Sequence, residues 1–308
     1  MPQRQNSPAS VRARLLDLSR KRGESFQLVL TQYANERLLY RLGNSEYKDR
    51  FVLKGAMLFV AWQGHLHRPT RDLDLLAYGP SEPFEVAAGF RKICEVQADD
   101  GITFIADSIE AATIKEDADY EGVRLNLIAE LAGARIPVQI DIGFGDAVVP
   151  LPPVLDYPAL LPIAPPVVRG YPREAVVAEK LEAMVELDIR NSRMKDFYDI
   201  WLISRTWPFE RGVLLRSIHA TFERRKTRLP SATPFALTTE FLTDSLKQAQ
   251  WQGFVKRVGL EAGTPPLIDL GVQLRDFLLP VLDARGQEEM VWLPGGPWRM
   301  RTHDSMQA

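Results

Sequence analysis

Apolar residues recur at two different spacings along this chain. In residues 10–42 and in most of residues 173–284 they follow the three- and four-residue spacing of an amphipathic helix. Much of residues 51–144 instead alternates with a period of two, which is typical of strands. Ser10 is suited to capping the first helix and Gly23 to ending it. The pattern therefore predicts two helices, then a core containing a sheet, then a mainly helical part.

The core combines both spacings. Its segments follow the order helix, strand, helix, strand and hairpin, which indicates a mixed sheet covered by helices and hence an α+β fold. After it, residues 151–172 are dense in proline, which excludes a helix or a central strand. We expect this segment to be a linker or to wrap the surface. The predicted domains are residues 1–150 with the core, the linker, and residues 173–308 as a helical C-terminal domain.

Two carboxylates lie on one predicted strand of the core. In residues 72–76, Asp72 and Asp74 alternate with leucines, so both point to the same face. Two adjacent anions require a cation, and Mg²⁺ (or Mn²⁺) prefers hard oxygen ligands and often takes only one or two protein carboxylates. The alternative is a solvated edge strand on which the two carboxylates pair with Arg68 and Arg71.

The neighbouring segments favour the metal. Residues 51–62 predict a short strand, a glycine turn and an apolar helix. At this turn Gly55 lets the backbone approach an anionic ligand and Lys54 adds a cation. Residues 138–146 predict another alternating strand, which places Asp141 within reach of becoming a third ligand. Together these features predict a phosphate site beside a metal site.

These features resemble the DNA polymerase β-type nucleotidyltransferase superfamily, which has a glycine-led helix, an Asp-x-Asp strand and a later third carboxylate. The resemblance is closer to one branch, the AbiEii/AbiGii toxin family, which includes the MenT toxins. Four segments match it in order: Lys54-Gly55-Ala56 and residues 68–75, 179–184 and 195–201. The resemblance implies a polymerase β-type core followed by a mainly helical domain that contributes to the active site.

The resemblance also assigns roles to residues. It implies that the catalytic residues are Asp72, Asp74, Lys180 and Asp196, with Asp141 joining the first two as metal ligands. The nucleotide-binding residues are then expected to be Lys54, Gly55, Thr70, Arg71 and Lys180. The superfamily usually has Gly-Ser or Gly-Gly at the turn, so Thr70 or backbone N–H groups must replace the serine hydroxyl here. From the residues alone, Lys180 could equally pair with a neighbouring carboxylate.

The function that the resemblance implies is transfer of a nucleotide from an NTP to RNA. The expected acceptor is the 3′ end of tRNA, which would block translation, and the expected partner is an antitoxin encoded nearby, as in abortive-infection systems for phage defence. Two alternatives remain: the same chemistry on a small molecule or a protein side chain, and a non-catalytic module that kept the fold.

A basic segment favours RNA as the acceptor. Positive side chains recur along an expected helix with an apolar side, and such a face suits an RNA backbone. The predicted RNA-binding residues are Arg211, Arg216, Arg224, Arg225 and Lys226. The alternative is a solvated helix face.

Composition limits the class of protein. The chain has 308 residues, of which 45% are hydrophobic and 25% charged, and its formal net charge is −2. These values are typical of a soluble two-domain protein and argue against a general DNA-coating protein. A single cysteine, Cys94, and the lack of a long apolar run predict a cytoplasmic protein without a membrane partner. His65 and His67 are expected to line a loop beside the site.

Overall fold

The chain folds into two compact units. The computed structural model describes residues 6–117, 120–283 and 289–301. The first unit comprises Met1–Gly145 and Pro152–Tyr171, and the second comprises Asp146–Leu151 and Pro172–Ala308. The first five and last seven residues of the predicted domains lie outside the described ranges.

The helices of the first unit begin and end where local chemistry favours it. They are α1 (Pro8–Arg22), α2 (Phe26–Gly43), α3 (Leu58–Gln63) and α4 (Pro83–Cys94). The N-cap of α1 is Ser7 rather than the predicted Ser10, because its side chain accepts the Ser10 N–H and Pro8 occupies the first turn. Gly23 ends this helix in the left-handed conformation, as predicted.

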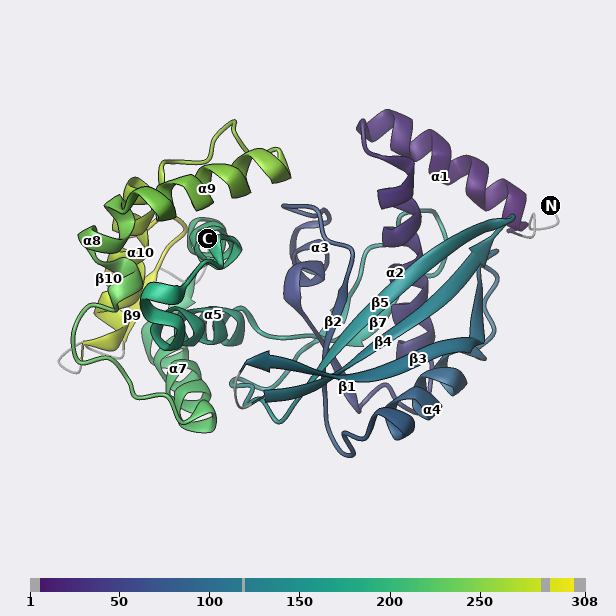
Figure 1. Cartoon of the computed structure of the whole chain (residues 1–308), viewed down its shortest axis with the longest axis horizontal. Coiled ribbons are helices and arrows are strands. Elements are labelled where there is room, and N and C mark those ends of the chain that lie inside the picture. Colours follow the sequence, from purple (N-terminus) through teal and green to yellow (C-terminus); the bar gives the residue numbers. More distant parts are fainter. Residues whose placement is uncertain (1–5, 118–119, 284–288, 302–308) are drawn as a thin grey trace. The chain divides into compact units, whose positions relative to one another are not determined.

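A five-stranded sheet forms the centre of the first unit (Figure 1). Its order is β1 (Phe51–Lys54), β2 (Leu73–Ala77), β5 (Ala134–Phe144), β4 (Tyr120–Leu131) and β3 (Thr103–Asp117). Only β2 and β5 pair in parallel, so the sheet is mixed, as predicted. On β5 the residues Ile136, Val138, Ile140 and Ile142 are buried, while Arg135, Pro137, Gln139 and Asp141 are more exposed. One face of β5 therefore packs in the core and the other carries polar groups.

The proline-dense segment belongs to the first unit instead of linking two domains. Its strands β6 (Val154–Asp156) and β7 (Val167–Arg169) pair antiparallel in a small separate sheet. Gly170 continues beside Leu53 of β1, and Tyr157 and Tyr171 are buried. Most of the predicted linker thus belongs to the first unit, and the helical unit resumes at Pro172, within one residue of the predicted boundary. Proline excludes helices and central strands, but it permits short strands at an edge.

A buried ion pair fixes α2 to the segment before β3. Arg41 Nη1 and Nη2 lie 2.7 and 3.2 Å from the two carboxylate oxygens of Asp100, and both side chains are almost fully buried. Arg41 also donates to the Ile102 carbonyl, and Tyr33 donates to the Asp100 carbonyl. Every charge here has several partners, which is the condition for tolerating it inside a protein.

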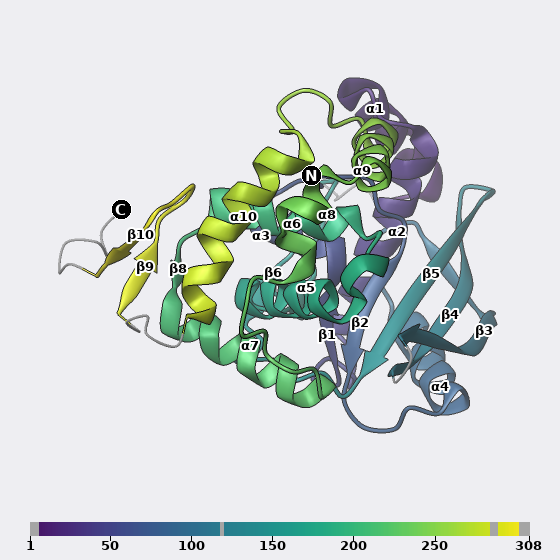
Figure 2. The same cartoon turned by 60° about the vertical axis from the view of Figure 1, so that its left-hand side comes forward.

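The second unit is mainly helical, as predicted (Figure 2). Its α-helices are α5 (Arg173–Leu187), α6 (Met194–Thr206), α7 (Arg211–Arg225), α8 (Thr239–Thr243), α9 (Ser245–Val258) and α10 (Leu267–Leu282). Asp244 begins α9 by accepting the Lys247 N–H. A small sheet joins β8 (Phe209–Glu210), β9 (Met290–Trp292) and β10 (Trp298–Met300). Trp292 and Trp298 donate to the carbonyls of Ser204 and Phe277, so this hairpin packs on its own unit.

The helices of the described residues are too short or too polar to cross a membrane. Within residues 6–117, 120–283 and 289–301, none combines the length and the hydropathy that crossing a bilayer requires.

Removing Arg41 should destabilise the first unit strongly. In Arg41→Met, the buried Asp100 side chain loses its main partner, a loss of about 3–5 kcal/mol for such pairs. Urea unfolding monitored by circular dichroism should show the lower midpoint. Arg20→Met breaks the exposed Arg20–Asp17 pair and should leave the midpoint nearly unchanged. Equal effects of the two substitutions would contradict the structural role of Arg41.

Candidate active site

The glycine turn after β1 lies directly against a carboxylate. Lys54 is the last residue of β1, and a 3-10 helix over Gly55–Met57 leads from it into α3. Gly55 has a φ of +73°, which side chains rarely adopt. A Cβ atom at this position would overlap the carboxylate of Asp74. Glycine is therefore required here, both for the backbone conformation and for the close approach of Asp74.

Four charged residues form one row across the sheet. Lys54 pairs with Asp74 between β1 and β2, Asp74 with Asp141 between β2 and β5, and Asp141 with Arg124 between β5 and β4. Directly opposed residues on neighbouring strands point to the same face. The row therefore reads cation, anion, anion, cation, with two carboxylates in the middle. The strand register thus brings together Lys54, Asp74 and Asp141, which the sequence placed in three separate segments.

Arg124 holds the third carboxylate. Its Nε and Nη2 atoms each lie 2.7 Å from one oxygen of Asp141, in a bidentate pair. This hydrogen bonding raises the pKa of Arg124, against a smaller opposing effect of burial, and Asp141, Asp72 and Asp74 add a favourable electrostatic effect. All three carboxylates are thus close enough to affect one guanidinium.

Carboxylate oxygens are hard ligands of the kind that a divalent cation such as Mg²⁺ prefers. Among the residues that the structure describes, no three or more His, Cys, Asp or Glu side chains form a group that could hold a metal. Mg²⁺ in nucleotide enzymes often has one or two protein carboxylates and takes its other ligands from water and phosphate. Asp72 and Asp74 fit that requirement, with Asp74 held against Gly55. Asp141 is bound by Arg124, so its role as a ligand stays a prediction.

Thr70 and Arg71, which precede β2, line different hollows. Thr70 lines a cavity of about 360 Å³ that is bordered by α2 and α3. Arg71 and Asp72 line an open groove of about 780 Å³ that continues over Gln139 and Asn126. Their common nucleotide-binding role therefore stays a prediction.

In the second unit, α5 and α6 bring Lys180 and Asp196 together. Lys180 Nζ lies 2.5 Å from Asp196 Oδ1 and 2.9 Å from Asp199 Oδ2. Arg193 Nε lies 2.6 Å from the other oxygen of Asp196. Burial acts to raise the pKa of Asp196, but Lys180 and Arg193 outweigh it and the pKa is lowered. This carboxyl is therefore ionised at neutral pH and keeps Lys180 oriented. The pairing with nearby carboxylates is also the alternative that the sequence left open.

One predicted RNA-binding arginine is buried. Arg211 is 1% exposed and donates to the carbonyls of Pro280, Val281 and Asp283. Its predicted role is corrected here to a structural one, because its guanidinium group is directed to carbonyls inside the unit.

Arg225 has acidic partners. Its guanidinium lies 3.2 Å from Asp146, 2.8 Å from Glu182 and 3.7 Å from Glu179. Despite burial, these carboxylates raise its pKa. Arg216, Arg224 and Lys226 are exposed and remain the predicted RNA contacts.

Comparison with known proteins identifies the family. Residues 37–273 match the family described as "Nucleotidyl transferase AbiEii toxin, Type IV TA system". The chain belongs to this family. Its members are nucleotidyltransferase toxins of toxin–antitoxin systems, so AbiEii membership confirms the resemblance that the four segments suggested. No curated protein matches the sequence.

Two solved structures from Helicobacter pylori are similar to this chain. JHP933 has 14% identity and a TM-score of 0.38, over 72% of this chain and 90% of its own. A second protein, assigned as a nucleotidyltransferase, has 14% identity and a TM-score of 0.35, over 72% of this chain and 92% of its own.

Sequence reasoning missed residues that complete both charged groups. Arg124 alternates with apolar residues as any half-exposed strand residue does, and only the pairing of β4 with β5 reveals Asp141 as its partner. Arg193 directly precedes α6 and pairs with Asp196, three residues further along the chain. The start of a helix could have suggested this spacing.

Replacing Gly55 tests the turn in this AbiEii chain. In Gly55→Ala the new methyl group must displace the Asp74 carboxylate, and we expect nucleotide transfer to fall by about 100-fold or more. The left-handed backbone adds about 1–2 kcal/mol of destabilisation. Gly23→Ala has a similar φ of +65° but no atom within 4 Å of the new Cβ. This control should lose stability without losing transfer, and equal kinetics of the two variants would show that Gly55 matters only for folding.

Proposed function

We propose that this chain transfers a nucleoside monophosphate from an NTP to RNA in a metal-dependent reaction. The proposed acceptor is the 3′ end of tRNA, whose modification would block translation. The cognate antitoxin would counteract this effect. AbiEii membership supports nucleotidyl transfer and the toxin–antitoxin context. The observation that carries the proposal is the row of Lys54, Asp74, Asp141 and Arg124 on one face of the sheet.

Two neighbouring carboxylates, Asp72 and Asp74, would hold the metal. With Asp72 and Asp74 as protein ligands, bound Mg²⁺ or Mn²⁺ would neutralise phosphate oxygens and polarise the phosphorus that is attacked. Lys54 stands beside Asp74 and supplies a fixed cation for the triphosphate. Gly55 keeps the backbone clear of the Asp74 carboxylate. These residues therefore favour binding of a polyanion at this edge of the sheet.

Arg124 would position the third carboxylate. In the structure it donates to both oxygens of Asp141 and so holds this side chain in place. Asp141 would then complete the ligands of the metal that activates the attacking hydroxyl. The role of Lys180 in neutralising the triphosphate follows from the family resemblance. Its pairing with Asp196 and Asp199 holds the ammonium group in place.

RNA as the acceptor is supported by surface charge. Arg216, Arg224 and Lys226 are exposed on or directly after α7. A phosphate backbone is attracted to such side chains independently of sequence. This surface charge favours RNA over a small molecule or a protein side chain as the proposed acceptor.

Neutralising the carboxylate pair tests the reaction. Asp72→Asn and Asp74→Asn should each lower transfer of labelled nucleotide to total RNA by about 100-fold or more, because each removes one anionic ligand of the metal. Thermal stability should stay equal or rise, since the substitution relieves repulsion between neighbouring anions. Asp107→Asn, at an exposed position of β3, is the matched control. A stable Asp74→Asn protein with full magnesium-dependent activity would rule out the metal assignment.

Charge reversal tests the acceptor. Arg224→Glu with Lys226→Glu should weaken transfer to RNA and reduce the salt dependence of RNA binding, by a slope of about 1 for each lost phosphate contact. NTP binding without acceptor should not change. Lys256→Glu with Arg257→Glu, on α9, changes the net charge equally and is the control. If both pairs leave transfer and its salt slope unaltered, the acceptor binds elsewhere or is not a nucleic acid. Arg225 is not suitable for this test because it is buried among carboxylates.

A further inference from the structure

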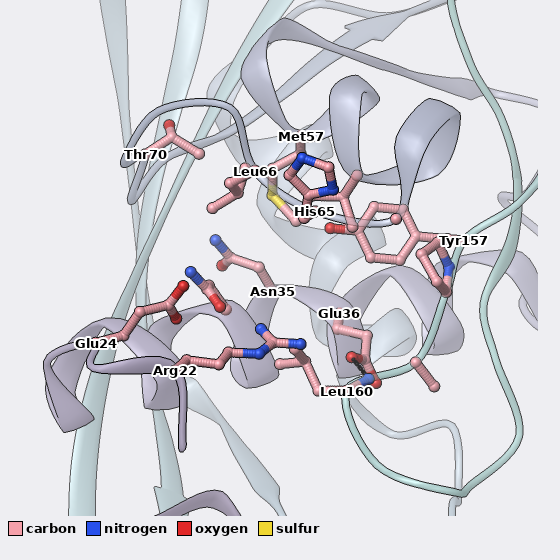
Figure 3. Close-up of a pocket in the computed structure, with 15 residues that line it drawn as sticks. Arg22, Glu24, Asn35, Glu36, Met57, His65, Leu66, Thr70, Tyr157 and Leu160 are labelled. Carbon is pink, nitrogen blue, oxygen red and sulfur yellow. Dashed lines mark hydrogen bonds between the residues drawn. The ribbon is translucent and has the colours of Figure 1, made fainter. Parts of the chain in front are cut away.

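The cavity lined by Thr70 lies within the first unit (Figure 3). We call it the α2–α3 cavity. Residues of α2, α3, the loop after α3, and residues 157–160 line it, whereas Lys54, Asp74 and Asp141 do not. Its volume of about 360 Å³ is within the range of small-ligand pockets.

Asn35 presents a buried acceptor to this cavity. The side chain is 2% exposed, and its Nδ2 donates to the Arg71 carbonyl over 3.0 Å. That hydrogen bond fixes the orientation of the amide, because only the nitrogen can donate. Asn35 Oδ1 is buried and has no hydrogen-bond partner in the part of the chain that the structure describes. An unsatisfied buried acceptor costs about 1–3 kcal/mol, so a ligand that donates to it would recover this energy.

The carboxylates of the cavity are also acceptors. Glu36 is 1% exposed; its Oε2 accepts the Leu160 N–H, and its Oε1 lies 2.8 Å from Arg37. Glu24 Oε2 is buried without a hydrogen-bond partner. The basic side chains of the lining, Arg22 and His65, are exposed instead. A ligand that enters deeply must therefore offer hydrogen-bond donors.

The walls suit a flat and uncharged ligand. Met57 and the ring of Tyr157 are buried in the lining, and the Tyr157 hydroxyl can donate or accept a hydrogen bond. Figure 3 shows Met57 and Leu66 across the cavity from Asn35 and Glu36. Because Arg37 already neutralises Glu36, a neutral donor is favoured over a cationic amine deep in the cavity. A ligand with two apolar faces and a donor-bearing edge has the chemistry of a nucleobase.

We propose that the α2–α3 cavity binds a nucleobase with an exocyclic amino group, which donates to Asn35 Oδ1. Adenine, cytosine and guanine have such a group. Uracil has a single ring N–H flanked by two carbonyl oxygens, which would face the acceptors of the cavity. The inference rests on the proposed function, in which the base belongs to the NTP or to the terminal nucleotide of the acceptor.

The position of the cavity suits either source. Met57 ends the turn that Gly55 begins, and Thr70 lies two residues before Asp72. The Asn35 amide also holds the Arg71 carbonyl, directly before Asp72. A base in this cavity would therefore contact both segments that carry the catalytic side chains to the sheet.

Direct binding tests the cavity without catalysis. Titration calorimetry of the full chain, without metal or RNA, should show binding of adenosine, cytidine or guanosine that is stronger than binding of uridine by about 10-fold or more. Ala159→Trp places an indole in the lining and should abolish this binding. Val154→Trp adds the same group at an exposed position of the same segment and should not. Binding of no nucleoside, equal binding of uridine, or unaltered binding by Ala159→Trp would overturn the proposal.

Kinetics of the same variants identify the source of the base. If the base is that of the NTP, Ala159→Trp raises the KM for NTP and changes the choice among the four NTPs, with the KM for RNA unchanged. If it is the terminal base of the acceptor, the KM for RNA rises instead. Normal values of both KMs in Ala159→Trp would refute the cavity while leaving the proposed function intact. A wild-type chain that transfers no nucleotide would refute the proposed function, and the calorimetry would still decide about the cavity.

Discussion

The repulsion between Asp74 and Asp141 is the constraint on which the first unit depends. Parallel pairing of β2 with β5 places these carboxylates side by side, where they would destabilise the sheet without compensation. Lys54 and Arg124 flank them on the outer strands, and Gly55 leaves space for the Asp74 side chain. The cations that offset the repulsion between the two carboxylates also make this face of the sheet suitable for binding a metal ion and a triphosphate.

The second unit balances its charges in the same manner, but in its interior. Asp196 and Asp199 share Lys180, and Arg225 is surrounded by carboxylates. Burial gives these groups a requirement for partners that exposed charges do not have. Arg225 therefore pairs with carboxylates inside the unit, whereas its sequence neighbours Arg224 and Lys226 are exposed at the surface.

The α2–α3 cavity and the charged row share two chain segments. The turn at Gly55–Met57 carries the glycine at one end and a cavity wall at the other. Residues 70–72 run from the cavity, which Thr70 lines, to the open groove, which Arg71 and Asp72 line. Short rigid segments of this kind are suited to coupling base binding with the position of reactive groups, because displacement at one end moves the other.

Sequence alone determined the local features: the alternating strand that carries Asp74, the glycine turn, the helical C-terminal part and the family. These depend on spacing within a few residues, which the backbone geometry fixes. Tertiary structure decided the rest. The pairing of Asp141 with Arg124, the pairing of Arg225 with Asp146 and Glu182, the orphaned oxygen of Asn35 and the inclusion of residues 152–171 in the first unit all depend on segments distant in sequence. Such contacts follow from strand register and packing, and a single sequence does not specify which distant residues will meet.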